Sequence, residues 1–140
     1  MISGIVAITV FAVVIAVIVL FARDPGPLPA DIAVSYELAW DRFDFDTLYS
    51  LSGDEMRDGL DKSAYIKVKT LAYAGRAELG HLASRVDVEE ITGGLAHALV
   101  RTRVTLHNGD VVHNHVALTK RNSSWWVTGY ELVASPPQPV

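Results

Sequence analysis

The sequence contains no cysteine among its 140 residues, and it has no excess of basic side chains. Without cysteine the protein forms no disulfide, carries out no thiol chemistry and binds no zinc through thiolates. Twelve Lys and Arg stand against sixteen Asp and Glu, which gives a formal net charge of -4. This mildly acidic balance argues against nucleic acid as a partner and against a polybasic attraction to anionic lipid.

Charge is also absent from the start of the chain. Residues 2–22 (ISGIVAITVFAVVIAVIVLFA) contain no charged side chain, and only Ser3, Gly4 and Thr9 interrupt the apolar run. A helix of about 20 apolar residues matches the hydrocarbon thickness of a bilayer. A secretory signal has a basic start, an apolar stretch of about 7–15 residues and small residues before its cleavage site. This run has no basic start, is longer, and has the large Leu20 as the third residue from its end. We therefore expect residues 1–23 to form an uncleaved transmembrane anchor in the cell membrane.

Prolines divide the rest of the chain. Residues 24–30 (DPGPLPA) predict a stiff, extended linker, because proline is excluded from helix interiors and favours extended chain. Residues 134–140 (ASPPQPV) predict a short disordered tail. Between them, residues 31–133 are long enough for one domain with a single core.

The domain begins with apolar residues at helical spacing. Asp31 is placed to cap a first helix, and Asp44 restarts the chain into a short second helix that carries Leu48 and Leu51. The apolar stripe of the first helix is Ile32, Tyr36, Trp40 and Phe43.

Two further helix signals follow. Ser52 and Glu55 have the spacing of a capping box, in which the serine caps a helix and the glutamate bonds back to it. Asp61 is placed to cap a longer helix. The apolar seam expected for that helix is Tyr65, Val68, Ala72, Gly75 and Leu79.

After His81 the pattern changes to strands. Residues 85–89 alternate in polarity, and residues 95–107, 111–121 and 125–133 are rich in β-branched and aromatic side chains. Asn108-Gly109 predicts a two-residue type I′ turn between the second and third strands. The fold class is therefore α+β, with two to three helices packed on a curved antiparallel sheet of about four strands.

A two-residue turn at Asn108-Gly109 fixes the facing pairs of the central hairpin. Thr102 then lies opposite His115 and Val104 opposite His113, so both histidines share a face with the apolar side chains of the second strand. In this register both faces are substantially apolar. Either helices cover one face and long Arg and Lys side chains shield the other, or the second face packs on a second copy or a partner protein.

The order of helices and strands resembles the nuclear-transport-factor-two-like, cystatin-like superfamily, a cone of helices held in a curved antiparallel sheet. The resemblance is carried by the tether with its Pro-rich linker, by residues 40–52 (WDRFDFDTLYSLS) and by residues 125–131 (WWVTGYE). It is closest in pattern to membrane-anchored, actinobacterial members. The family includes isomerases, polyketide cyclases, dehydratases and members without activity, so the fold does not transfer a function.

The resemblance also bears on assembly and orientation. Family members often dimerise through the sheet, which implies a homodimer or a partner protein on that face. It slightly favours an extracytoplasmic domain, whereas the single Arg23 after the anchor favours a cytoplasmic one. The side of the membrane therefore stays open.

His113 and His115 are the residues with the most metal-like spacing, because side chains two apart on a strand share a face. A three-residue loop at 122–124 would bring Glu131 beside His115 and complete a two-His, one-carboxylate set, whereas a two-residue loop would bring Tyr130 there. His97 and His107 are expected on the opposite face. With two secure ligands only, we expect no metal and interpret the histidines as polar residues on a cavity wall or sheet edge.

Asp41, Asp44 and Asp46 lie where the first helix ends, and we interpret them as caps and turn formers. The alternative is one buried carboxylate that acts as a general base beside an aromatic or imidazole side chain. No convergent acid–base pair supports it, so we expect no catalytic residue and no cofactor. The residues expected to line a ligand pocket are Tyr36, Trp40, Tyr65, His113 and His115.

The sequence thus predicts a single-pass membrane-anchored, non-catalytic domain for interaction or small-ligand binding. The alternatives are an isomerase- or cyclase-like enzyme on the same fold, or an accessory subunit of a membrane complex that uses the anchor helix as an interface. A cavity with a buried acidic or imidazole side chain between helices and sheet would favour the enzyme.

Overall fold

The computed structural model describes residues 26–133. The predicted anchor at residues 2–22 and the predicted tail at residues 134–140 lie outside this range, as does the start of the predicted linker. No helix within residues 26–133 has the length and apolar character needed to cross a bilayer.

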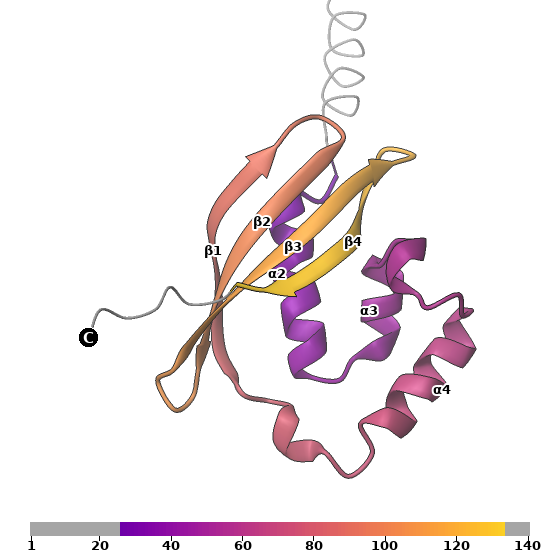
Figure 1. Cartoon of the computed structure of the whole chain (residues 1–140), viewed down its shortest axis with the longest axis vertical. Helices are drawn as coiled ribbons and strands as arrows, with labels where there is room; N and C mark the ends of the chain where they lie inside the picture. Colours follow the sequence, from indigo (N-terminus) through magenta and orange to yellow (C-terminus); the bar gives the residue numbers. More distant parts are fainter. Residues whose placement is uncertain (1–25, 134–140) are drawn as a thin grey trace, which may run out of the picture.

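Three α-helices precede a four-stranded antiparallel sheet, which confirms the predicted α+β class (Figure 1). The helices are α2 (Pro29–Asp41), α3 (Phe45–Leu51) and α4 (Lys62–Ala72). The strands pair in chain order and are β1 (Ala83–Gly93), β2 (His97–Leu106), β3 (Val111–Arg121) and β4 (Ser124–Leu132). Two short 3-10 helices, Asp54–Met56 and Ala77–Leu79, lie in the connections around α4.

Two of the predicted helix caps are confirmed. The Asp44 carboxylate accepts a hydrogen bond from the Thr47 N–H at 3.1 Å, and that of Asp61 accepts one from the Ala64 N–H at 2.8 Å. The cap predicted at Asp31 is wrong. Pro29 begins α2 earlier, because its fixed φ suits the first turn, and the Asp31 side chain instead accepts the N–H of Leu28 at 3.2 Å.

The capping box at Ser52 is also wrong. The Ser52 hydroxyl donates to the Leu48 carbonyl at 2.6 Å, and the Glu55 side chain forms an ion pair with Arg121. The helix that Asp61 caps is shorter than predicted. It ends at Ala72, and three residues later Gly75 has a φ of 76°, which a right-handed helix excludes.

The register of the central hairpin differs from the prediction by one residue. The Leu106 N–H donates to the Asp110 carbonyl at 2.8 Å, so the loop holds three residues and only Gly109 among them has positive φ. This is a turn followed by a left-handed residue rather than a type I′ turn. Arg101 now pairs with His115, and Thr102 pairs with Asn114. A shift of one residue exchanges the faces of every side chain on one strand relative to the other.

The β3–β4 hairpin carries the type I′ geometry instead. Asn122 and Ser123 have φ values of 52° and 65° and form a two-residue loop. Such a loop alone would place Tyr130 opposite His115. A bulge at Thr128, between the Ala117 and Leu118 pairings, adds one residue, so His115 pairs with Glu131 after all.

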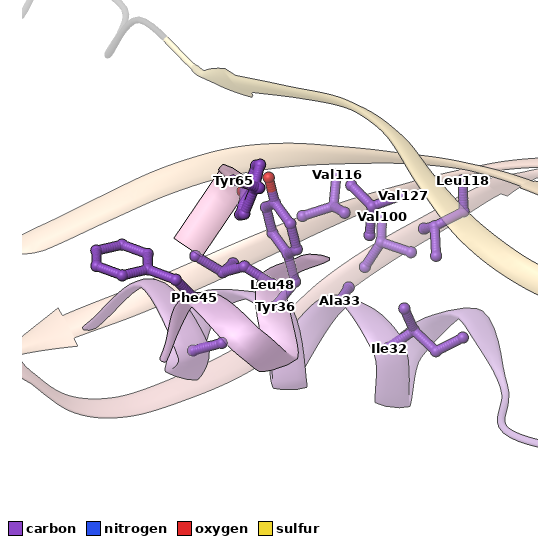
Figure 2. Packing of buried hydrophobic residues seen from close by; sticks show 11 residues of the cluster. Ile32, Ala33, Tyr36, Phe45, Leu48, Tyr65, Val100, Val116, Leu118 and Val127 are labelled. Carbon is purple, nitrogen blue, oxygen red and sulfur yellow. The ribbon is translucent and has the colours of Figure 1, made fainter. Parts of the chain in front are cut away.

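The core lies between the helices and the inner face of the sheet, where side chains from α2, α3 and α4 meet valines of the strands (Figure 2). Tyr36 and Tyr65 are 1% and 2% exposed. Burial raises the pKa of both phenols, to about 12 for Tyr65, because the charged form loses its hydration.

Asp41 joins the end of α2 to the start of the sheet. Its carboxylate accepts the backbone N–H groups of Leu82 and Ala83 at 2.8 and 2.9 Å. Its own carbonyl accepts the N–H of His81 at 2.6 Å. These three bonds satisfy the backbone N–H groups of residues 81–83, which lie between the last helix and the regular part of the sheet.

We expect Asp41→Ala to lower the free energy of unfolding by about 1–3 kcal/mol, because two backbone donors lose a charged acceptor. Asp46→Ala is the matched control, since Asp46 forms only an exposed ion pair with Lys62 and should cost less than about 1 kcal/mol. Urea unfolding followed by circular dichroism measures both. Equal losses in the two variants would contradict the role of Asp41.

Candidate functional site

Glu37 is a buried carboxylate beneath the sheet. It lies on α2 and is 6% exposed. Its Oε1 accepts hydrogen bonds from the Thr102 hydroxyl at 2.8 Å and from the Asn114 Nδ2 at 2.9 Å. Its Oε2 accepts one from the Tyr130 hydroxyl at 2.7 Å. One helix and three strands therefore meet at a single side chain.

The donors to Glu37 are all neutral. Within residues 26–133, Lys, Arg and His pair with other carboxylates, and none forms an ion pair with Glu37. A buried carboxylate needs hydrogen bonds to replace its lost hydration. Here the Thr102 hydroxyl, the Asn114 amide and the Tyr130 phenol supply these hydrogen bonds. The Glu37 carboxylate is therefore held by neutral donors and by no cationic side chain among the described residues.

Asn114 contributes a donor and an unused acceptor. Its Nδ2 donates to Glu37 and, at 2.9 Å, to the Tyr130 hydroxyl, which uses both amide hydrogens. Its Oδ1 is buried and has no hydrogen-bond partner among the described residues. Buried acceptors without a partner are uncommon in folded proteins, and Trp40 Nε1, on another residue of the same region, is likewise buried without a partner among the described residues.

These polar groups line a cavity of about 270 Å³ between the helices and the inner face of the sheet. Glu37, Asn114 and Tyr130 form its polar wall, and Asp41 adds a second carboxylate. The other lining residues are mainly apolar: Trp40, Phe43, Tyr73, Leu79, Leu82, Ala83, Val104, Leu106 and Val112. An apolar hollow with a few convergent polar groups is the usual form of a small-molecule site.

Tyr130 is held as a hydrogen-bond donor. Burial raises the pKa of its phenol, and the neighbouring negative charge of Glu37 raises it further. Both causes oppose a second negative charge next to the carboxylate. The hydroxyl therefore stays protonated across the physiological range and donates to Glu37.

The five residues predicted to line a pocket are spread over two sides of the sheet. Trp40 lines the cavity, whereas Tyr36 and Tyr65 are enclosed in the core. His113 and His115 lie on the outer face, since the observed register places Thr102 and Asn114 on the inner one. The structure thus brings the first three to the helical side of the sheet and leaves the histidines apart from them.

On the outer face each histidine has a carboxylate neighbour. His113 Nδ1 lies 3.3 Å from Glu89, which also pairs with Arg101 at 3.2 Å. His115 Nδ1 lies 3.6 Å from Glu131. No group of three His, Asp or Glu side chains in residues 26–133 is arranged to hold a metal ion. The chemistry on this face is that of ion pairs, and packing of a second copy or a partner there stays a prediction.

His97 and His107 were expected on the face opposite His113 and His115. His97 instead lies on the same outer face, where its Nδ1 is 3.5 Å from the Thr119 hydroxyl. His107 lies in the β2–β3 loop and donates its backbone N–H to the Leu82 carbonyl at 2.9 Å. The one-residue change of register moves His97, and the longer loop takes His107 off the sheet.

The acidic cluster has structural partners. Asp41 binds backbone N–H groups of the segment leading into β1, and Asp44 caps α3. The hydrogen bond from the Thr47 hydroxyl lowers the pKa of Asp44, because it stabilises the charged form. Asp46 pairs with Lys62 at 3.0 Å. The interpretation of these residues as caps and turn formers agrees with these contacts.

Sequence analysis did not find Glu37, Thr102, Asn114 or Tyr130 as a group. One signal was present: Glu37 lies between Ala33 and Trp40 on the apolar side of the first helix, where a carboxylate needs buried donors. Thr102 and Asn114 are the polar residues of otherwise apolar strand faces. They become neighbours only in the observed register, which the assumed turn at Asn108-Gly109 concealed.

Comparison with known proteins supports the fold. No family model and no curated protein matches the sequence. An NTF2-like protein from Campylobacter jejuni, provisionally described as a transpeptidase, superposes with a TM-score of 0.57 at 20% identity. The match covers 72% of this chain and 97% of that protein. The chain therefore has an NTF2-like fold, as the resemblance predicted, and at this identity the likeness extends to the fold alone.

A second solved structure is similar to a lesser degree. It is a SEC-C-motif-containing protein from Rhodopseudomonas palustris, with a TM-score of 0.50 at 18% identity. The match covers 76% of this chain and 79% of that protein. The shared arrangement is again one of helices against an antiparallel sheet, and the function must be argued from the site.

Alkaline pH should unfold the domain partly through Tyr130. Because the folded-state pKa of its phenol is raised above the ordinary value, this stabilisation is complete below about pH 10 and is lost as the pH rises further. Tyr130→Phe should reduce the free energy of unfolding at pH 8 by about 1–2 kcal/mol. It should also make the alkaline decline shallower, by up to about 1.4 kcal/mol per pH unit. Urea unfolding between pH 8 and 11.5 measures both effects, and parallel curves would contradict the coupling.

Proposed function

We propose that the domain binds a small, mainly apolar molecule that carries a hydrogen-bond donor, and that residues 2–22 hold the domain at a membrane. The observation that supports the binding site is Asn114, a residue of the cavity wall whose buried Oδ1 has no partner among residues 26–133. A ligand N–H or O–H directed at this oxygen would satisfy it.

The lining residues define the chemical class of the ligand. Aromatic and aliphatic side chains form most of the wall, so apolar surface on the ligand would be favoured there. The carboxylate of Glu37 has no fixed cation, so an anionic group would be repelled from the polar end. A neutral or cationic molecule with one donor and an apolar ring or chain fits these constraints.

The membrane tether is supported by the sequence. Residues 2–22 lack charge and match the bilayer thickness, and the Pro-rich linker separates them from the domain. This arrangement resembles the membrane-anchored, actinobacterial members of the NTF2-like superfamily. The tether would place the binding cavity at the membrane surface on one side of the bilayer.

Indole and indene test the ligand class, because they share size and shape but only indole carries an N–H donor. We expect indole to bind more tightly, by about fivefold for one hydrogen bond of about 1 kcal/mol. Asn114→Ala should abolish the preference for indole, because it removes the acceptor. Calorimetric titration of the full chain in lipid nanodiscs measures both affinities, and empty nanodiscs correct for partition into lipid.

His115→Ala is the matched control. His115 directly follows Asn114 in β3, but its side chain lies on the outer face of the sheet. The preference for indole should be unchanged in this variant. Equal affinities for the two rings in the wild type, or no binding of either ring, would contradict the proposed ligand class.

A proton-transfer enzyme is the second candidate, and Glu37 is the observation that favours it. Its Oε2 accepts only the Tyr130 hydroxyl, so one acceptor position on this oxygen remains available towards a bound molecule. A carboxylate in an apolar cavity suits the removal of a proton next to a carbonyl group.

The enzyme alternative is tested with 2-indanone, whose protons next to the carbonyl exchange slowly with solvent deuterium. If Glu37 acts as a base, the protein should accelerate this exchange and Glu37→Gln should abolish the acceleration. NMR in deuterated buffer follows the exchange. A rate equal to that of buffer alone would leave ligand binding as the function and contradict the enzyme.

A further inference from the structure

One end of the molecule gathers the start of α2, the β1–β2 turn and the β3–β4 turn (Figure 1). Lys120, near the end of β3, donates its backbone N–H to the Ala96 carbonyl of the β1–β2 turn at 2.8 Å. The start of α2 joins them because Pro27 and Ile32 share a groove with Trp125. The described chain begins at this end, directly after the apolar residues 2–22 and the first linker residues.

Two large apolar side chains are exposed at this end. Leu95 is 94% exposed in the β1–β2 turn, and Leu28 is 52% exposed immediately before α2. Neither has a structural reason to be leucine, since a turn and a helix N-cap both favour polar residues. Exposed apolar groups in such positions are typical of surfaces that meet a partner or a membrane.

Beside the start of α2 lies an apolar groove of about 320 Å³, which we term the tryptophan groove. Its apolar walls are Pro27, Ile32, Leu51, Trp125 and Trp126. Serine side chains complete its rim, at positions 35, 50, 123 and 124. Half-buried tryptophans with a polar rim have the character of side chains at a membrane–water interface, where an apolar ring and a polar edge are both accommodated.

The charges near the groove largely cancel. Arg121 pairs with Glu55 at 2.6 Å, and Arg57 lies 3.5 Å from Asp54. Asp31 lines the groove itself, and the Lys120 ammonium lies 5.9 Å from the centre of the Trp125 ring. This end is therefore no basic patch, so contact with lipid here would depend on apolar and aromatic side chains rather than on anionic headgroups.

The length of the intervening chain limits how far this end can be from the bilayer. Four residues lie between Ala22 and Pro27, and an extended chain spans at most about 3.6 Å for each of the five steps, or about 18 Å in all. We propose that Leu28, Leu95 and the tryptophan groove dock on the interfacial region of the bilayer. This inference rests on the proposed membrane tether.

Docking at this end fixes the direction of the ligand cavity. The cavity is lined by Leu106 and Val112, which flank the β2–β3 turn, and that turn lies at the opposite end of the sheet (Figure 1). The molecule therefore stands with its anchored end on the lipid and its cavity towards water. A ligand reaches Glu37 from the aqueous side rather than from the bilayer.

The absence of cysteine allows a single label to test this arrangement. Leu95→Cys, labelled with the fluorophore NBD, is reconstituted as full chain in vesicles of neutral phosphatidylcholine. We expect its emission to shift to shorter wavelength and to be quenched several-fold more strongly when brominated phosphatidylcholine replaces the ordinary lipid. Leu71→Cys is the matched control, because Leu71 is 68% exposed on α4, away from this end. Its label should show neither change.

Flotation of the same vesicles separates failure of this inference from failure of the tether. If the protein floats with the vesicles but the label at position 95 behaves like that at position 71, docking is overturned and the tether stands. If the protein does not float, both are overturned. A label at position 95 that is quenched only when anionic lipid is added would also contradict docking through apolar contacts. The expected result is quenching at position 95 alone, with and without anionic lipid.

Discussion

The burial of the Glu37 carboxylate constrains the whole domain. A carboxylate that is removed from water must be given hydrogen bonds, and here the donors come from β2, β3 and β4. The position of α2 under the sheet is thereby tied to the register of both hairpins that contain these strands. A slip of one residue in the β2–β3 hairpin would turn Thr102 or Asn114 to the outer face, and a slip in the β3–β4 hairpin would do the same to Asn114 or Tyr130. In each case Glu37 would lose a donor.

Local patterns predicted the elements but not their register. Helical spacing from Ile32 to Trp40, the caps at Asp44 and Asp61, and the β-branched runs gave the α+β class and the element order. Phe43, predicted on the same helical stripe, lies beyond the end of α2 and has a φ of 53°. The register depended on loop details that no short pattern contains: a three-residue loop at Gly109 and a bulge at Thr128. The bulge restored the His115–Glu131 pair that a two-residue loop alone would have removed. The candidate site escaped prediction because its residues are adjacent only after both hairpins form.

The inner face of β2 and β3 is mainly apolar and buried, whereas the outer face carries charged and polar side chains. The observed register explains why the two kinds of residue are separated. On the inner face Val100, Val116 and Leu118 are almost fully buried, and the Thr102 hydroxyl and the Asn114 amide nitrogen donate hydrogen bonds to Glu37. On the outer face oppositely charged long side chains pair, as Glu89 does with Arg101, and His113 lies beside the same carboxylate. The apparent apolarity of both faces in the sequence came from combining odd positions of one strand with even positions of the next.

The two ends of the sheet carry different features. One end forms a wall of the cavity, and the other exposes apolar and aromatic side chains. At one end α2 finishes at Asp41, whose carboxylate orders the chain leading into β1 and thereby fixes one wall of the cavity. At the other end, the start of α2 lies beside Trp125 and the exposed Leu95 turn. Because a single helix runs between them, the proposed attachment of its first turn to a membrane would set the direction of the cavity at its last. The distance between lipid and the proposed ligand would then depend on the length of α2.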